Sequence, residues 1–137
     1  MPHGVIRMEN KKIYISDDKY SEFLDKIRDF SERRHYILKG KKGSDKDIFV
    51  IYDREVVSGV LVGMIDTFMG RYLLPQRIRL TIEIMKKEKK IEVNLRGDVM
   101  MIDWDIVDDR PTKRNVMRCN FLLDELIYEI NNLLYKS

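Results

Sequence analysis

The segment that most constrains the fold is the last one, residues 112–135, where apolar residues recur at the spacing of a long amphipathic helix. At about 100° per residue, one broad face of this helix is apolar. Its members are Val116, Cys119, Leu122, Leu123, Leu126, Ile127, Ile130, Leu133 and Leu134. Because such a face has to be buried against other apolar structure, the rest of the chain must supply a surface for it.

A second, narrower stripe runs along the same predicted helix and consists of Met117, Phe121, Tyr128 and Tyr135. Polar residues separate it from the broad face. A helix that only covers a core needs one stripe. The second stripe therefore predicts a further contact, with the first helix, with a ligand or with another subunit.

Strict alternation between residues 77 and 95 predicts the surface that the helix covers. Arg77 to Met85 places apolar side chains on one face and polar ones on the other, and Ile91 to Leu95 repeats the pattern after a lysine-rich turn. This is typical of an antiparallel hairpin with one dry and one wet face. Gly97 and Asp98 are expected to break or bulge the strand, with a further strand over Val99 to Trp104.

The first half of the chain is expected to contain one helix and several strands. Lys12 to Ser16 is β-rich, and helical spacing follows from Asp18 to Arg34. A strand is expected over Tyr36 to Lys39 and another over Ile48 to Tyr52, separated by a loop from Gly40 to Ser44.

For residues 56–74, we expect a strand to about Gly63 and then a short helix or irregular turn as far as Leu74.

The element order predicts an α+β domain with a mainly antiparallel sheet of five to seven strands. An N-terminal helix at about 18–34 and a long C-terminal helix at about 112–135 pack on one face of it. This order is similar to the helix-grip arrangement of START-like and pollen-allergen-like domains, which implies a curved sheet, a C-terminal helix and a ligand cavity between them. Longin-like or profilin-like sheets with flanking helices are the alternative.

Composition fits one folded domain with a charged exterior. The chain has 137 residues, of which 44% are hydrophobic and 36% charged, with a net charge of +3. The high Lys, Glu and Ile content would suit a thermophile. We expect a cytoplasmic protein without a membrane span, since no apolar run is long enough to cross a bilayer.

Residues that could support catalysis or bind a metal do not form a recognisable set. His3 and His35 are the only histidines, and Cys119 is the only cysteine. Five aspartates cluster at 98, 103, 105, 108 and 109, without the glycine and glutamate of a calcium loop. The sequence therefore favours no catalytic residues, no metal site, no cofactor and no enzymatic activity.

Three binding functions remain open. The leading hypothesis is an apolar small molecule or lipid held between the sheet and the last helix, since methionine suits adaptable apolar sites. Its expected contacts are Met64, Phe68, Trp104, Met117 and Phe121.

The second hypothesis is a homodimer that uses the narrow stripe, with Tyr128 and Tyr135 as partner contacts. The third is nucleic-acid binding through basic residues, which requires that separate loops converge. The residues expected to contact nucleic acid are Arg33, Arg34, Lys41, Lys42, Arg77 and Arg79.

Overall fold

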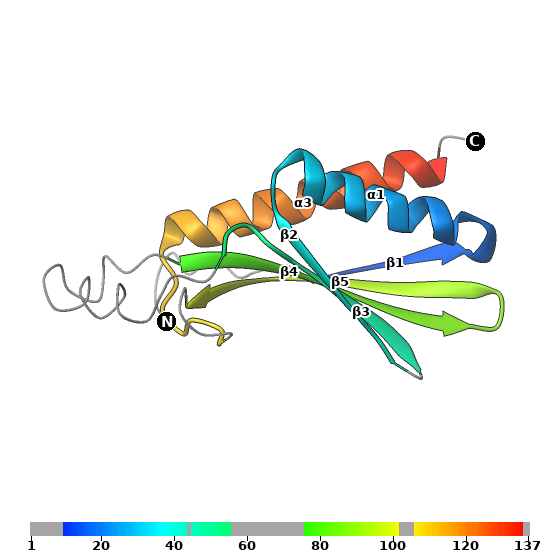
Figure 1. Cartoon of the computed structure of the whole chain (residues 1–137), viewed down its shortest axis with the longest axis horizontal. Coiled ribbons are helices and arrows are strands. Elements are labelled where there is room, and N and C mark those ends of the chain that lie inside the picture. Colours follow the sequence, from blue (N-terminus) through cyan, green and yellow to red (C-terminus); the bar gives the residue numbers. More distant parts are fainter. Residues whose placement is uncertain (1–9, 44, 56–75, 102–105, 136–137) are drawn as a thin grey trace, which may run out of the picture.

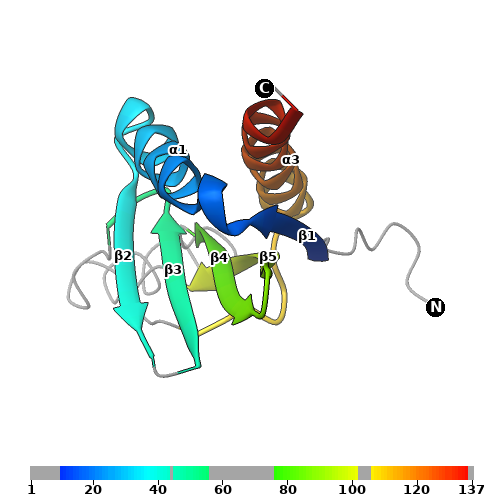
Figure 2. The same cartoon turned by 90° about the vertical axis from the view of Figure 1, so that its right-hand side faces the viewer.

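The computed structural model describes residues 10–43, 45–55, 76–101 and 106–135, with only the backbone described at 134 and 135. One antiparallel sheet carries two helices on one of its faces (Figures 1 and 2). A single 3₁₀ turn, Asp17–Lys19, leads into the first helix. The other elements are β1 (Asn10–Ser16), α1 (Tyr20–Arg33), β2 (Ile37–Lys42), β3 (Lys46–Tyr52), β4 (Gln76–Lys87), β5 (Lys90–Met101) and α3 (Lys113–Tyr135).

The sheet has the strand order β1-β5-β4-β3-β2, with every neighbouring pair antiparallel. The longest hairpin, β4 with β5, pairs without interruption from Gln76 opposite Met101 to Lys87 opposite Lys90. Because no pairing skips a residue, alternate side chains of each strand stay on one face throughout. The sheet therefore has two consistently different faces.

The core lies between the sheet and the two helices. Its strand residues are the alternating apolar ones that the hairpin pattern predicts, and its helix residues come from the broad face of α3 and from α1. The most deeply buried members, each at most 1% exposed, include Phe23, Phe30, Leu80, Ile82, Val93, Leu95, Leu123, Leu126 and Ile130. The predicted α+β fold, with both helices on one sheet face, is confirmed; the helix-grip analogy is consistent with this arrangement and is not confirmed by it.

Two predicted strand boundaries were wrong, both at glycines. β5 runs through Gly97 without a bulge, because this glycine makes room for α3: a Cβ there would lie 2.5 Å from Cys119 Sγ. β2 likewise runs through Gly40, where a Cβ would lie 2.8 Å from a ring carbon of its cross-strand partner Phe49. Close packing, rather than a turn, explains both glycines.

The helix ends follow local capping chemistry. Thr112 is the N-cap of α3, since its hydroxyl oxygen accepts a hydrogen bond from the Asn115 backbone amide at 3.2 Å. At the end of α1, His35 adopts a positive φ of 57°, and the next residue, Tyr36, donates its amide hydrogen to the carbonyl of Ser31. This is the usual left-handed helix end, with histidine in place of glycine.

Some predictions concern residues outside the described ranges. These are the strand and turn expected over 56–74 and the part of the last predicted strand beyond Met101, including Trp104. Among the described helices, none has both the length and the apolar character needed to cross a membrane.

Candidate functional site

The face of the sheet opposite the helices is the most charged surface of the described strands. Strand alternation places nine basic and three acidic side chains on it, an excess of six positive charges. The basic residues are Lys12, Lys39, Lys41, Lys46, Arg77, Arg79, Lys87, Lys90 and Arg96, and the acidic ones are Glu83, Glu92 and Asp98. We call this surface the uncovered face, because neither helix lies over it (Figure 2).

Glu92 organises one end of the uncovered face. Its Oε1 lies 3.4 Å from the ammonium groups of both Lys12 and Lys87, and it accepts a hydrogen bond from the Tyr14 hydroxyl at 3.4 Å. Burial opposes the charged form of this carboxyl, but the hydrogen bonds and charges of Lys12 and Lys87 outweigh it and lower the pKa of Glu92. One carboxylate thus holds two lysines on the sheet.

Asp98 performs the same role near the middle of the sheet. Its Oδ2 lies 3.3 Å from Arg79 Nη2 and 3.2 Å from Arg96 Nε. Arg79 belongs to β4, whereas Arg96 and Asp98 belong to β5, so the cluster also bridges the strands. Each of the two acidic hubs thus pairs one carboxylate with two basic side chains.

Tyr52 on β3 contacts two further cations, one on each neighbouring strand. The Arg77 guanidinium carbon lies 4.0 Å from the centre of the Tyr52 ring, and the Lys39 ammonium lies 5.8 Å from it. Such contacts favour a cation electrostatically, because the ring face is negative. Arg77 is only 4% exposed.

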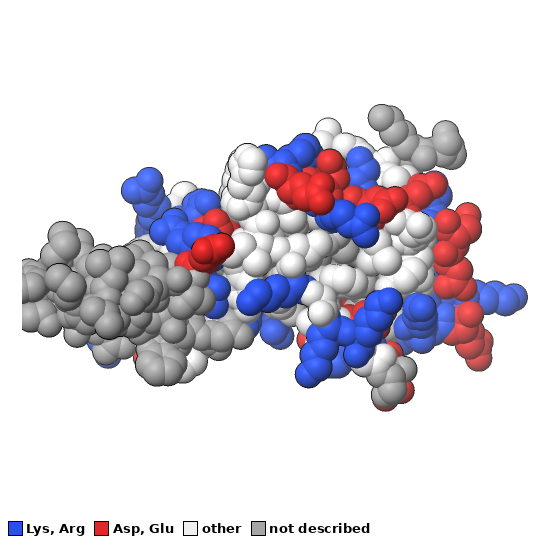
Figure 3. Space-filling model, in the orientation of Figure 1, with Lys and Arg blue, Asp and Glu red and all other residues white. Residues whose placement is uncertain are grey.

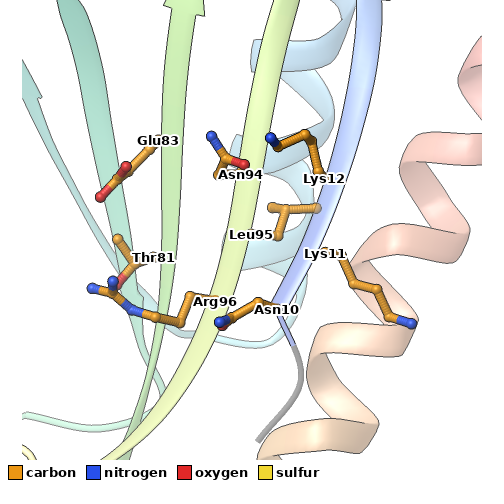
Figure 4. A pocket seen from close by; sticks show the side chains of 8 residues that line it. All are labelled: Asn10, Lys11, Lys12, Thr81, Glu83, Asn94, Leu95 and Arg96. Carbon is orange, nitrogen blue, oxygen red and sulfur yellow. The ribbon is translucent and has the colours of Figure 1, made fainter.

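A groove of about 250 Å³ lies where β1, β5 and β4 adjoin (Figure 4). Lys12, Asn94 and Arg96 line it together with Asn10, Thr81 and Glu83. Figure 4 shows the Arg96 side chain reaching across β4 toward Thr81, whereas Lys11 points away toward α3. The Thr81 hydroxyl is buried and has no hydrogen-bond partner among the described residues. The groove thus offers ammonium, guanidinium, amide and hydroxyl donors.

The two lysine-rich hairpin turns lie at the same end of the sheet. Lys46 begins β3 opposite Met85, two residues before β4 ends at Lys87, so the β2–β3 turn lies beside the β4–β5 turn. Figure 3 shows basic side chains gathered over this end, with acidic ones beside them. Their convergence depends on strand register, which the sequence alone leaves open.

The residues predicted to contact nucleic acid lie in three places. Arg77, Arg79 and Lys41 belong to the uncovered face, and Lys42 lies at the adjoining turn. Arg33 and Arg34 lie instead at the end of α1, in the helix layer. Arg34 pairs with Glu125 of α3 at 3.1 Å, and Arg33 pairs with Glu129. These two arginines tie the helices together.

Sequence reasoning missed Lys12, Asn94 and Arg96, which line the groove. The alternation that placed Arg77 and Arg79 on the wet face continues through Asn94 and Arg96, and it could have identified these two. The position of Lys12 needed the pairing of β1 with β5, where Lys12 lies opposite Asn94. That pairing joins segments about 80 residues apart, which periodicity cannot predict.

The narrow stripe of α3 faces outward. Met117, Phe121 and Tyr128 are 54%, 61% and 67% exposed, so most of each residue is open to solvent. Met64, Phe68 and Trp104, the other expected ligand contacts, lie outside the described residues, as does the side chain of Tyr135. An apolar ligand between sheet and helix therefore stays an untested prediction.

Two further residues that could support chemistry, Cys119 and Asp108, lie in the described part of the chain. Burial, followed by the charges of Asp98 and Asp53, raises the pKa of the Cys119 thiol to about 12, which disfavours the reactive thiolate. Asp108 accepts a hydrogen bond from Gln76 at 2.6 Å. Within the described parts of the chain, no three His, Cys, Asp or Glu residues form a group that could hold a metal ion.

Comparison with known proteins adds little to this site. No protein-family model matches the chain, and no curated protein matches it in sequence. Among solved structures, the vertebrate conserved region of human METTL16 resembles it with a TM-score of 0.45 and 8% identity, over 89% of this chain and 98% of that chain. A likeness of this size supports no inference about function. Function has to be inferred from the side chains of the uncovered face.

Proposed function

We propose that the chain binds single-stranded nucleic acid across the uncovered face of its sheet. The observation that supports this most is the excess of basic over acidic side chains on that face, nine against three in the described strands. Proteins that bind single strands combine a positive surface along the phosphate backbone with aromatic groups that stack on bases. The proposal keeps the cytoplasmic location expected from the sequence, where RNA is available.

The outer groups of the face suit phosphate binding. Lys12, Arg96 and Lys46 have side chains that are 54%, 48% and 48% exposed, so they can reach a ligand while their carboxylate partners stay close to the sheet. Binding a polyanion releases its counterions, which favours association at low salt. Exposed cations above the buried Glu92 and the half-buried Asp98 provide an arrangement that suits such binding.

The edge of the face supplies groups that could contact bases. Tyr14 on β1 is 54% exposed, and its ring is available for stacking although its hydroxyl bonds to Glu92. Asn10 and Asn94 line the neighbouring groove and carry amides that both donate and accept hydrogen bonds. We expect these contacts to give modest preferences among bases, with most of the affinity coming from phosphates.

The test compares two arginines of similar exposure and pairing. Arg96 on the uncovered face pairs with Asp98, and Arg28 on α1 pairs with Asp25 at 3.5 Å. Arg96→Gln should weaken binding of a labelled single-stranded oligonucleotide about five- to tenfold and lower the slope of log K against log salt by about 0.7, the loss of one phosphate contact. Arg28→Gln, the matched control, should leave affinity and slope unchanged.

Fluorescence polarisation over a range of salt concentrations measures both quantities. The proposal is overturned if the wild-type chain binds neither single-stranded DNA nor RNA at low salt. It is also overturned if the two variants weaken binding equally, since charge at any position would then suffice.

A further inference from the structure

The outward face of α3 carries an apolar stripe that the proposed nucleic-acid function does not use. Six large hydrophobic side chains are exposed among the described residues, and three of them, Met117, Phe121 and Tyr128, lie on this face. Phe121 and Tyr128 border a groove of about 490 Å³ between α3 and the end of α1. Exposed apolar side chains that gather on one face mark interaction surfaces more often than isolated ones do.

The charges of α3 run against the preference of an isolated helix. Every charged residue of its first half is basic, namely Lys113, Arg114 and Arg118, and every charged residue from Leu122 to Leu133 is acidic, namely Asp124, Glu125 and Glu129. A helix dipole favours the opposite order, with acids at the N-terminus and bases at the C-terminus. Folding of this helix alone therefore does not explain its charge order.

Several of these charges have partners within the chain. Arg118 pairs with the buried Asp53, and Glu125 and Glu129 pair with Arg34 and Arg33. Lys113 and Arg114 at the basic end, and Asp124 in the acidic half, are exposed. A surface with separated basic and acidic ends is complementary to a second copy of itself in antiparallel orientation.

From this charge order and the apolar stripe together, we propose that α3 pairs with α3 of a second copy about a two-fold axis near Phe121. Arg114 and Tyr128 each lie seven residues from Phe121, which is two helical turns and about 10 Å along the axis. A two-fold axis therefore brings Arg114 of each copy over the Tyr128 ring of the other, a cation–π contact.

The same axis brings the two Phe121 rings together. In this dimer the helix layers meet and the sheets lie on the outside. The uncovered faces then point away from the interface, so pairing does not compete with the proposed nucleic-acid site. Isologous contacts of this kind are typical of two-fold dimers.

Cysteine cross-linking tests the position of the axis. Phe121→Cys places a thiol beside its own copy, so mild oxidation should give a disulfide-linked dimer on a non-reducing gel. Tyr128→Cys alone should remain monomeric on the gel. The two copies of this residue lie on opposite sides of the axis, each two helical turns away from it. An equimolar mixture of Arg114→Cys and Tyr128→Cys chains should give the linked dimer. The native Cys119 is fully buried and should not contribute.

Sedimentation equilibrium supplies the second measurement. The wild-type chain should be a dimer at about 100 µM, and Phe121→Glu, which places two like charges at the axis, should be a folded monomer by circular dichroism. A monomeric wild type at that concentration overturns the proposal, as does faster self-linking of Tyr128→Cys than of Phe121→Cys. Arg96→Gln should still form dimers, which separates this result from the outcome of the nucleic-acid experiment.

Discussion

The two faces of the sheet bury neighbouring residues by different means. On β4, Ile82 points toward the helices and is fully buried, whereas Thr81 beside it points to the uncovered face and is still only 5% exposed. Helices α1 and α3 cover the first face. On the second, long charged side chains such as Arg96 cover the strands beneath them (Figure 4). One strand therefore shows both modes of burial at successive residues.

The two faces therefore differ in how their side chains contribute to the stability of the fold. Burial of apolar area stabilises the covered face by about 25 cal/mol per Å². On the uncovered face, ion pairs such as Arg79 with Asp98 must first offset the loss of hydration, and replacing buried pairs with apolar groups is often neutral or stabilising. Stability alone does not account for so charged a face, which is consistent with the binding function proposed for it.

The largest expected effect is on the covered face, at Gly97. A Cβ here would lie 2.5 Å from Cys119 Sγ, so Gly97→Ala must displace α3 or the strand and should lower the free energy of unfolding by about 1–3 kcal/mol. Urea denaturation measures this loss. Adding Cys119→Ala removes the clashing sulfur, so the double variant should be more stable than the sum of the single changes predicts. Simple additivity would show that the close contact is not the cause.

A smaller, pH-dependent effect is expected at Glu92 on the uncovered face. Its pKa is lowered in the folded chain from an ordinary value of 4.5, so its stabilising contribution is present above that value and is lost as the pH falls through the lowered pKa. Glu92→Gln should therefore unfold at a lower temperature than wild type at pH 7, and the difference should narrow below about pH 4.5.

Thermal unfolding between pH 7 and pH 3 checks this prediction. Lys12→Gln removes one of the two ammonium partners and should abolish part of the pH-dependent difference. If the difference in unfolding temperature between wild type and Glu92→Gln stays constant over this pH range, the assigned role of the carboxylate is contradicted.

The smallest expected effect has the opposite sign and concerns Thr81. Its buried hydroxyl has no hydrogen-bond partner among the described residues, so Thr81→Val removes an unsatisfied polar atom and should raise the free energy of unfolding by about 1 kcal/mol. Thr81→Ser keeps the hydroxyl but loses a methyl group, and should be less stable than wild type. Equal stability of the valine and serine variants in urea would contradict this interpretation.

Sequence periodicity predicted most of the fold. Alternation from Arg77 to Met85 and from Ile91 to Leu95 identified the β4–β5 hairpin and its core face, and helical spacing identified α1 and α3 to within a few residues. It erred at Gly40 and Gly97, because a glycine that ends a strand and one that admits a neighbouring side chain look alike in sequence. Only the contacts with Phe49 and Cys119 distinguish the two cases.

The candidate site was less predictable than the fold. Arg77 and Arg79 were assigned to the right face by alternation alone. Arg33 and Arg34 were assigned to the same function, but they pair with Glu129 and Glu125, which lie more than 90 residues away in the chain. A cluster of basic residues in sequence therefore did not identify a cluster in space.

By itself, the sequence determined which side chains share a face, because periods of 2 and 3.6 residues follow from local backbone geometry. Tertiary structure alone decided which strands are neighbours, and so which charges meet: Lys12 reaches Glu92, and the β2–β3 and β4–β5 turns share one end of the sheet. These contacts depend on strand order and register. Long-range packing fixes both, since a strand carries the same alternating pattern whichever neighbour it pairs with.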